Sequence, residues 1–543
     1  MYQDYARESR VLTVVGWRVV WLAASIITFE EEWGDETVTS SSRFDVVIVG
    51  AGPAGCVFAN RLTEDSDRTV ALLEAGPDYG SDPGAWPDEM RDITEIAPDS
   101  HSWGFTHVGR TEDNALALSR ARVVGGTSTV NGCIWLRGSA VDYDEWEALG
   151  NPGWSFDDLL PYFRRSETDP AGGPMHGSDG PVPISRLPAT AQTKVDHAFI
   201  SAATALGFPE SADLNCGRAQ IPCVGPPPKN VVDGVRMNAA FTYLAPARSR
   251  PNLTIMPDSH VDRVALDGQR AVGVRTVDGR VLEAGEIILC AGAFGSPEIL
   301  MRSGIGPADH LRELGIPVVA EVSGVGQNLL DHPLVGGLME CAIAPGNEPP
   351  SRTFFPILIK ARGRRSTSEI DFHVFSGQSF DTVRGAWNLW LSVSLQTSRS
   401  RGKVRLTSAD PAATLDIDHH YYSEPDDLEI VCDAVELVNQ LVRTSPLSKL
   451  VEPIPGRAMV WRDRDELRSN VRQNVGTTFH PTGTCRMGPG SDSDSVVDVE
   501  GRIHGIAGLR VADASIFPMI PRANIHCTIV AVAEKLADAV RNA

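Results

Sequence analysis

The chain has 543 residues, of which 42% are hydrophobic and 22% are charged, a balance typical of folded globular proteins. Its length allows two or three domains of about 100–200 residues each. The formal net charge of −21 argues against a nucleic acid as a partner, because phosphates would be repelled.

The first 42 residues differ from the rest of the chain. Residues 11–29 are apolar enough to suggest a signal or an anchor, but Arg18 interrupts them and an acidic run follows at residues 30–36. A charge near the centre of a membrane span costs roughly 2.5–3.5 kcal/mol. The sequence therefore predicts a disordered or dispensable extension over residues 1–42, with membrane association as the less favoured alternative. The nine cysteines form no CxxC pair, which favours a reduced, cytoplasmic protein.

The first recognisable motif begins at residue 44. Residues 44–49 are a β-branched run of the kind buried in a parallel sheet. They are followed by Gly50, Gly52 and Gly55 in a GxGxxG pattern and then by a helical stretch, residues 56–62. In a dinucleotide-binding turn, the three glycines allow the tight turn, the approach of a pyrophosphate and close packing of helix on strand, and the helix N-terminus faces the phosphates.

A second strand supports this interpretation. Residues 69–73 end in Glu74, which stands 19 residues after Gly55. An acid at this position accepts hydrogen bonds from the hydroxyls of an adenosine ribose and disfavours a 2′-phosphate. The pattern predicts a bound dinucleotide. FAD and NAD both fit it at this point, and the choice depends on other segments.

Several later segments are rich in glycine and small polar residues. Residues 122–132 contain paired glycines followed by hydroxyl side chains, which let the backbone pass close to a flat ligand, although an ordinary turn would look the same. Residues 287–293 read as a strand leading into a helix, with Ser296 as its N-cap and Pro297 as its first residue. The others are a loop at 324–332, the HPTGTCRMG block at 480–488, a strand and turn at 509–515, and a helix from about 521 to 540.

In this order, these segments resemble the glucose–methanol–choline (GMC) oxidoreductase family over residues 43 to about 540. The resemblance implies FAD as the cofactor, with the first block on its ADP half and Glu74 on the ribose. Val261 looks like the adenine-contacting residue, and Asp513 and Ala514 match the pair beside the flavin's phosphate and ring. The matching positions along the flavin and its pyrophosphate are Val123, Gly126, Thr127 and Asn131.

Two departures from the family pattern are informative. Some members attach FAD covalently through a histidine just before the asparagine of the Gly-Gly block, and here that position is Val130. The flavin is therefore expected to be bound noncovalently. Many bacterial members carry a second asparagine where this chain has His526. A histidine occurs there in other branches, including glucose and aryl-alcohol oxidases, so substrate details from choline-type enzymes do not transfer directly.

The resemblance also implies the chemistry. Oxidation of an alcohol by a flavin requires a hydride to leave the carbon and the hydroxyl proton to be accepted, and histidine, with a pKa of roughly 6.5, suits the second task. His480 is predicted to be this base and His526 its partner, which stabilises the developing charge. His332, Cys485 and Arg486 are predicted to be structural.

The predicted fold class is α/β: a Rossmann-like FAD-binding part with a parallel sheet, and a substrate part with an antiparallel sheet capped by helices. Residues 43–330 are expected to be mainly FAD-binding, with inserted substrate segments at about 155–231. Residues 331–474 are expected to be mainly substrate-binding, and residues 475–543 to return to the FAD part with the catalytic histidines. A set of aromatic residues could line a pocket or simply be core: Phe354, Phe355, Trp387 and Trp390.

The predicted function is FAD-dependent oxidation of a small-molecule alcohol at its CH–OH group, with O2, a quinone or another carrier as the electron acceptor. Two alternatives stay open: a hydroxynitrile-lyase-like flavoprotein without net redox chemistry, and a catalytically silent flavin-binding module. The sequence contains no GxSxG, HExxH or metal-type spacing, so hydrolase and metalloenzyme functions are not predicted and no metal is expected.

Overall fold

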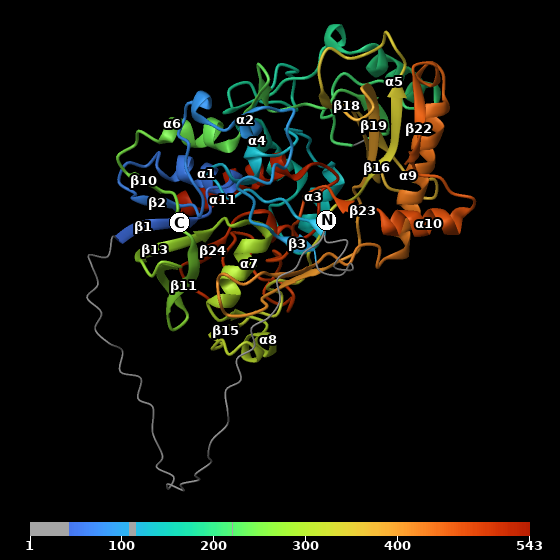
Figure 1. Cartoon of the computed structure of the whole chain (residues 1–543). Coiled ribbons are helices and arrows are strands. Elements are labelled where there is room, and N and C mark those ends of the chain that lie inside the picture. Colours follow the sequence, from blue (N-terminus) through green and yellow to red (C-terminus); the bar gives the residue numbers. More distant parts are fainter. Residues whose placement is uncertain (1–42, 108–115, 220, 543) are drawn as a thin grey trace, which may run out of the picture. The chain divides into compact units, whose positions relative to one another are not determined.

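The computed structural model describes residues 43–107, 116–219 and 221–542; the predicted extension and its apolar run lie outside these residues. The first sheet has the strand order β10-β2-β1-β13-β12-β11, with β24 also paired to β13 (Figure 1). Five strands are parallel: β1 (Arg43–Val49), β2 (Val70–Leu73), β10 (Leu253–Met256), β13 (Val281–Leu289) and β24 (Leu509–Val511). The other two, β11 (Val261–Asp267) and β12 (Arg270–Thr276), are antiparallel.

The parallel strands are buried on both faces. All four residues of β2 and the last four of β1 are buried, as expected for a sheet covered by helices on each side. Helix α1 (Pro53–Leu62) packs against the C-terminal helix α11 (Ile525–Arg541). The first and the last helix of the described residues therefore lie together on this sheet, although more than 450 residues separate them.

Helix α7 corrects one sequence prediction. It spans Gly292–Arg302, so Ser296 and Pro297 lie inside it rather than at its start. Gly292 has φ +79°, which lets the chain turn out of β13 so that the helix begins five residues earlier than predicted. Pro297 lacks an N–H for the carbonyl of Ala293, and that carbonyl instead accepts a hydrogen bond from Thr484 Oγ1 at 2.6 Å.

The second sheet is antiparallel, with the order β22-β16-β19-β18-β17-β7 and with β23 paired to β16. Helices α5 (Lys194–Ala205) and α9 (Pro425–Arg443) pack on one of its faces (Figure 1). The strands are β7 (Cys223–Gly225), β16 (Pro333–Ile343), β17 (Thr353–Ala361), β18 (Phe372–Asp381), β19 (Ala386–Leu395), β22 (Val451–Ala458) and β23 (Val475–Thr477).

The two faces of this sheet have different neighbours. Along β18, Phe372 and Val374 belong to the apolar core shared with α9, whereas Phe375 lies on the other side and lines a cavity. On β19, Leu389 and Leu391 belong to the same core and Trp390 lines the cavity. This period of two is that of a strand with one face on helices and the other on a site.

The remaining elements are short or peripheral. The other helices are α2 (Asp88–Arg91), α3 (Ala140–Ala148), α4 (Phe156–Ser166), α6 (Ala245–Ala247), α8 (Ala308–Glu313) and α10 (Arg464–Gln473). The other strand pairs are β3 (Thr106–His107) with β4 (Leu116–Ala117), β5 (Glu167–Thr168) with β6 (Val182–Pro183), β8 (Val231–Val232) with β9 (Val235–Arg236), β14 (Ile305–Gly306) with β15 (Ala320–Glu321), and β20 (Lys403–Arg405) with β21 (Asp416–Asp418).

The predicted α/β fold class, with a Rossmann-like part and an antiparallel sheet capped by helices, is confirmed. The boundaries expected between its parts stay predictions. Within the described residues, none of the helices has the length and apolar character that crossing a bilayer requires.

Candidate active site

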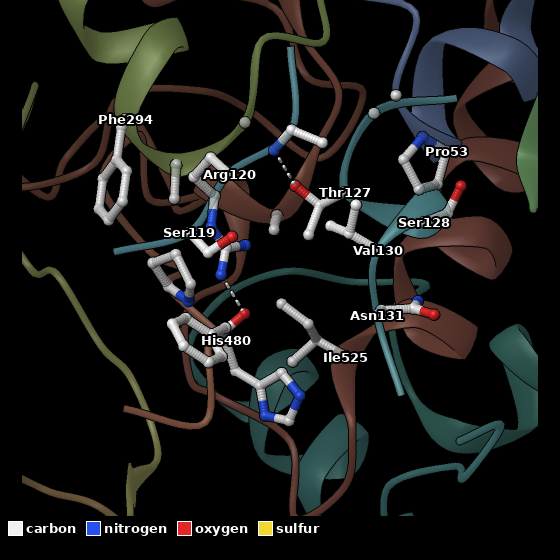
Figure 2. A pocket seen from close by; sticks show the side chains of 18 of the residues that line it. Pro53, Ser119, Arg120, Thr127, Ser128, Val130, Asn131, Phe294, His480 and Ile525 are labelled. Carbon is white, nitrogen blue, oxygen red and sulfur yellow. Dashed lines mark hydrogen bonds between the residues drawn. The ribbon is translucent and has the colours of Figure 1, made fainter. Parts of the chain in front are cut away.

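A cavity of about 490 Å³ lies against both sheets and is lined by residues from the whole length of the described chain (Figure 2). One end is formed by the glycine turn after β1, by Glu74 and by the start of α7. The other end is formed by strands of the antiparallel sheet and by the two histidines predicted to react. We call these the nucleotide end and the reacting end.

The nucleotide end is built from close backbone contacts. A Cβ at Gly126 would lie 2.6 Å from the Cα of Gly52, so these two loops can approach this closely only because residue 126 is a glycine. A Cβ at Gly52, by contrast, would meet no protein atom within 4 Å. Gly52 also precedes α1, whose first residues receive no side-chain cap. Free N–H groups and open space at a helix N-terminus suit a pyrophosphate.

Glu74 sits at the end of β2 with its carboxylate buried. Oε2 accepts a hydrogen bond from the Ala51 N–H and Oε1 accepts one from the Gly76 N–H, both at 3.0 Å. Burial raises the pKa of Glu74 to about 7, against the opposing effect of these hydrogen bonds. The backbone of the glycine turn thus fixes the acid at the cavity wall, where a ribose would meet it.

Asp513, which lines the cavity, joins the start of α7 to the turn after β24. Its Oδ2 accepts hydrogen bonds from the Gly292 N–H at 2.8 Å and from Ser296 Oγ at 2.6 Å, and its Oδ1 accepts one from the Ser515 N–H at 2.8 Å. Burial raises the pKa of Asp513, and the hydrogen bonds act against that rise. Ala514, the next residue, also lines the cavity.

Eleven of the thirteen predicted site residues line this one cavity: Gly50, Gly52, Glu74, Gly126, Thr127, Asn131, Val261, His480, Asp513, Ala514 and His526. Gly55 lies behind it, where a Cβ would come 2.0 Å from the Gly50 carbonyl oxygen. Val123 is fully buried next to Gly76 and outside the lining. The glycine cradle, the buried acid and a cavity of about 490 Å³ lined from the glycine turn to the two histidines fit a dinucleotide such as FAD.

His480 stands at the reacting end in a polar cluster (Figure 2). Its Nδ1 is 2.9 Å from Nδ1 of His332, and its Nε2 is 3.3 Å from Nδ2 of Asn524. Burial, together with His332, Arg120 and His373, lowers the pKa of His480 well below its usual value. Asp331 accepts the backbone N–H groups of both His332 and His480, at 2.8 and 2.9 Å, and so holds the two loops in register.

His526 lines the same cavity from the first turn of α11. Its Nδ1 is 3.3 Å from Nδ2 of Asn131, and the ring of Trp135 meets it edge-on at 5.0 Å between ring centroids. Burial lowers the pKa of His526 to about 4. Both predicted reactive histidines are therefore neutral near pH 7.

Sequence reasoning missed Arg120, a buried cation beside His480. Its Nη2 donates to the Phe479 carbonyl at 2.5 Å (Figure 2), and burial lowers its pKa only to about 10, so it stays charged. It also missed Asn524 and Trp135. Asn524 lies two residues before His526, so its closeness to the predicted pair was the available signal. Nothing local in the sequence marks Arg120 or Trp135.

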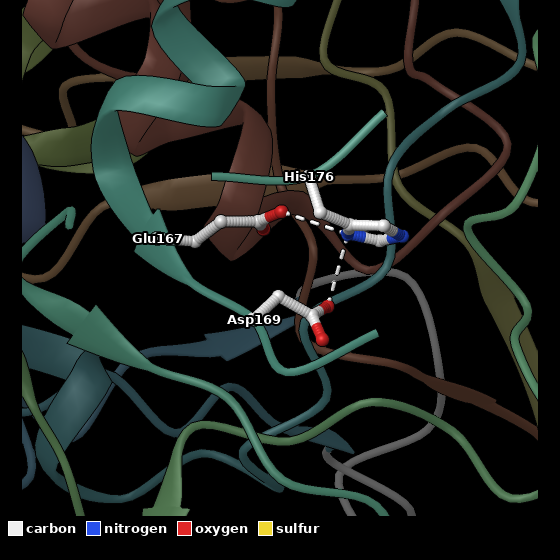
Figure 3. Close-up of side chains that lie close together, drawn as sticks. All are labelled: Glu167, Asp169 and His176. Atoms are coloured by element: carbon white, nitrogen blue, oxygen red, sulfur yellow. Dashed lines mark hydrogen bonds and ion pairs between the residues drawn. The ribbon is translucent and has the colours of Figure 1, made fainter. Parts of the chain in front are cut away.

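A cluster of Glu167, Asp169 and His176 brings its ligand-type atoms close together (Figure 3). Arg137 and Arg186 pair with the two acids. Burial alone would lower the pKa of His176, but its hydrogen bonds, Asp169 foremost, raise that pKa to about 10. A protonated ring has no lone pair for a metal. The cluster is therefore an ion-pair network, and Glu167 Oε2 also accepts the Trp135 Nε1–H at 2.8 Å.

Comparison with known proteins identifies the family. The models of the N- and C-terminal parts of GMC oxidoreductases match residues 44–334 and 398–533. The chain belongs to the GMC oxidoreductase family. The oxygen-dependent choline dehydrogenase of Chromohalobacter salexigens is 36% identical over 550 residues, which cover 93% of this chain and 96% of that protein. The corresponding enzyme of Ectopseudomonas mendocina is 35% identical, with 92% and 94% covered.

Solved structures of similar proteins support the same family assignment. Pyridoxine 4-oxidase from Mesorbium loti is 32% identical, with a TM-score of 0.82 and coverage of 92% of this chain and 99% of that one. A formate oxidase variant from Aspergillus oryzae RIB40 is 26% identical, with a TM-score of 0.82 and coverage of 93% and 99%. The chain is thus an FAD-dependent GMC oxidoreductase that acts on CH–OH groups, which confirms the family, the cofactor and the reaction class predicted from its motifs.

Proposed function

We propose that the enzyme oxidises an alcohol with His480 as the proton acceptor and His526 as its partner. The observation that carries the proposal is that two neutral histidines from separate segments line one cavity with the nucleotide cradle. FAD, when bound, supplies the acceptor for the hydride. The cradle would hold it through the glycine turn, Glu74 and the loop that contains Thr127 and Asn131.

His480 would take the hydroxyl proton on Nε2. This nitrogen faces Asn524, while Nδ1 faces His332. Burial also lowers the pKa of His332 to about 4, so His332 and His480 are both neutral, and one of their two facing Nδ1 atoms must carry the proton that the other accepts. A proton on His480 Nδ1 leaves the lone pair of Nε2 as an acceptor, which faces the Asn524 Nδ2 donor at 3.3 Å and would accept from the substrate hydroxyl once the alcohol is bound. The lowered pKa keeps this basic form populated well below pH 6.5.

His526 would donate a hydrogen bond to the substrate oxygen as negative charge develops on it. Its edge-on contact with Trp135 fixes the plane of the ring, and Asn131 lies at Nδ1. Arg120 adds a buried positive charge on the side of His480. A preorganised donor of this kind in a water-poor site typically contributes about 2.7–4 kcal/mol to transition-state stabilisation.

Three finer points belong to the same proposal. FAD would be bound noncovalently, because Val130 stands where a covalent member carries histidine. The electron acceptor would be O2, in line with the oxygen-dependent choline dehydrogenases, with a quinone or another carrier as the alternative. The relatives are named for choline, pyridoxine and formate, so their names do not fix the substrate. A cytoplasmic location without membrane association is also proposed.

Anaerobic mixing of the holoenzyme with a panel of alcohols tests the proposal through the flavin absorbance. Bleaching by an alcohol establishes the reductive half-reaction, and the rate at which colour returns in air separates an oxidase from a dehydrogenase. Acid denaturation then separates a free flavin from one that stays with the protein. A bound flavin that no alcohol bleaches would refute the proposal and favour the lyase-like or silent alternative.

A further inference from the structure

The reacting end of the cavity has one wall of aromatic rings. Phe355 packs against Phe375 and Trp390 with ring centroids 5.1 and 5.6 Å apart, and Phe354 lies 5.7 Å from Trp390. All four come from the antiparallel sheet and line the cavity. We call Phe354, Phe355, Phe375 and Trp390 the aromatic wall. Trp387, on the same strand as Trp390, does not line the cavity and packs against the core shared with α9.

Two glycines make room for these rings. A Cβ at Gly377 would come 1.9 Å from Cζ2 of Trp390, and a Cβ at Gly132 would come 2.7 Å from Cε2 of Phe355. Phe355 itself has φ +51°, a conformation that bulky residues rarely adopt and that the surrounding packing must hold. The rings are therefore fixed in place.

The aromatic wall adjoins both reactive histidines. Gly132 follows Asn131, whose Nδ2 is 3.3 Å from His526. Ala523 shares an apolar cluster with Phe375, Phe355 and Trp390, and the next residue, Asn524, faces His480. A ring seated on the wall would thus place a short side group beside the two imidazoles.

The charged groups beside the wall are a partly buried lysine and an exposed arginine that is paired with an acid. Lys229 donates from Nζ to the Phe354 carbonyl at 2.6 Å, and burial lowers its pKa only to about 8. The Arg352 guanidinium lies 5.7 Å from the centroid of the Phe354 ring and pairs with Glu95 at 3.2 Å. Among the described lining residues, the acids are Glu74, Glu298 and Asp513. These three belong to the parallel sheet, its α7 helix and the turn after β24.

We infer that the aromatic wall binds a neutral aromatic group, so that the substrate is an uncharged aromatic primary alcohol rather than a quaternary ammonium alcohol. The inference rests on the proposed function. Aromatic pairs gain stability beyond their buried area, whereas a cationic headgroup on the wall would be desolvated beside the Lys229 ammonium, and none of the described lining acids lies on the wall to compensate it. The substrate carbon loses a hydride to FAD and the hydroxyl proton goes to His480, which leaves an aldehyde.

Two matched pairs of alcohols test charge and aromaticity separately in anaerobic flavin reduction by the holoenzyme. 3,3-Dimethyl-1-butanol has the shape of choline without its charge, and it should reduce the flavin with at least about tenfold higher efficiency than choline. Benzyl alcohol should exceed cyclohexylmethanol by about two- to tenfold. A preference for choline over its neutral isostere would overturn the inference and leave the proposed function intact.

Two variants test whether the aromatic wall causes the preference for an aromatic alcohol. Trp390→Leu should remove most of the preference for benzyl alcohol over cyclohexylmethanol, whereas Trp387→Leu on the same strand should keep it. Equal preferences in the two variants would overturn the inference. Acetophenone, an aromatic ketone that cannot be oxidised here, gives a second readout through the perturbed flavin spectrum. Should no alcohol bleach the flavin while acetophenone binds and Trp390→Leu weakens its binding, the proposed function fails together with the assignment of an alcohol substrate, and only the binding of a neutral aromatic group on the wall is retained.

Discussion

The two ends of the cavity are built in different ways. At the nucleotide end the decisive contacts involve the backbone: glycine against glycine, N–H groups against Glu74, and a helix start without a side-chain cap. At the reacting end they involve side chains that come from distant segments, such as His332 and His480, 148 residues apart, or Asn131 and His526, 395 residues apart.

This difference explains the electrostatics of each end. The nucleotide end buries an acid with its pKa raised to about 7, held by two backbone N–H groups. The reacting end buries histidines with lowered pKa values beside a charged arginine. One end is arranged to hold hydroxyl and phosphate groups, and the other is arranged to keep its bases unprotonated.

The largest expected effect is a loss of flavin reduction without a loss of FAD binding. His480→Asn should lower the rate of flavin reduction by about 10²–10⁴-fold, because proton transfer loses its acceptor, while the FAD content of the purified protein stays unchanged. Rapid-mixing absorbance measures both. His420→Asn is the matched control, since His420 is exposed at φ +51°, which asparagine tolerates. Loss of FAD from His480→Asn would mean that FAD binding depends on the reacting end as well as on the nucleotide end.

Two glycines at the nucleotide end should respond differently to an added methyl group. Gly52→Ala should leave the stability of the FAD-free protein unchanged, because its Cβ meets no protein atom, but weaken FAD binding by about tenfold or more through blocked pyrophosphate approach. Gly126→Ala should lower both stability and FAD affinity, because Gly126 has φ +53° and a Cβ on it would press on the Cα of Gly52. Urea unfolding and flavin-fluorescence titration measure the two quantities. Equal stability losses in both variants would refute this account of the cradle.

The same contrast decides what the sequence could predict. Glu74 and the glycines follow from spacing within one βαβ unit, because backbone geometry is encoded locally. His480 and His526 came from resemblance, since no local pattern brings them together. Arg120 and Trp135 were missed because their roles depend on packing between remote segments. The early start of α7 was missed because the Thr484 hydroxyl, far along the chain, replaces the helix donor that Pro297 lacks.

Stability should depend on pH with opposite signs at the two ends. The folded-state pKa of His526, about 4, lies below its unfolded value of about 6.5, so its contribution is present above pH 6.5 and is lost as pH falls towards 4. At pH 5 the loss of this contribution to the free energy of unfolding is about 2 kcal/mol.

Glu74 has a folded-state pKa of about 7. It therefore contributes stability below pH 4.5, and this contribution is lost as pH rises through 7. The two contributions oppose each other between about pH 4.5 and 7, so in urea unfolding from pH 5 to 7 the stability should rise less with pH in His526→Asn, and more in Glu74→Gln, than in the unmodified enzyme. Equal slopes in the two variants and the unmodified enzyme would contradict these assignments.

The smallest expected effect concerns a residue that acts only through another. Trp135 contacts His526 edge-on and donates its Nε1–H to Glu167 of the ion-pair network, so Trp135→Phe keeps an aromatic ring but frees its orientation. A hydrogen bond contributes about 0.5–1.5 kcal/mol, so the limiting rate of flavin reduction should fall by up to about tenfold, with substrate affinity nearly unchanged. Trp154→Phe loses a similar bond, from Nε1 to the Val499 carbonyl at 3.0 Å, outside the cavity lining. If both variants slow reduction equally, the effect is a general loss of stability; if only Trp135→Phe does, the geometry of His526 depends on packing as well as on hydrogen bonds.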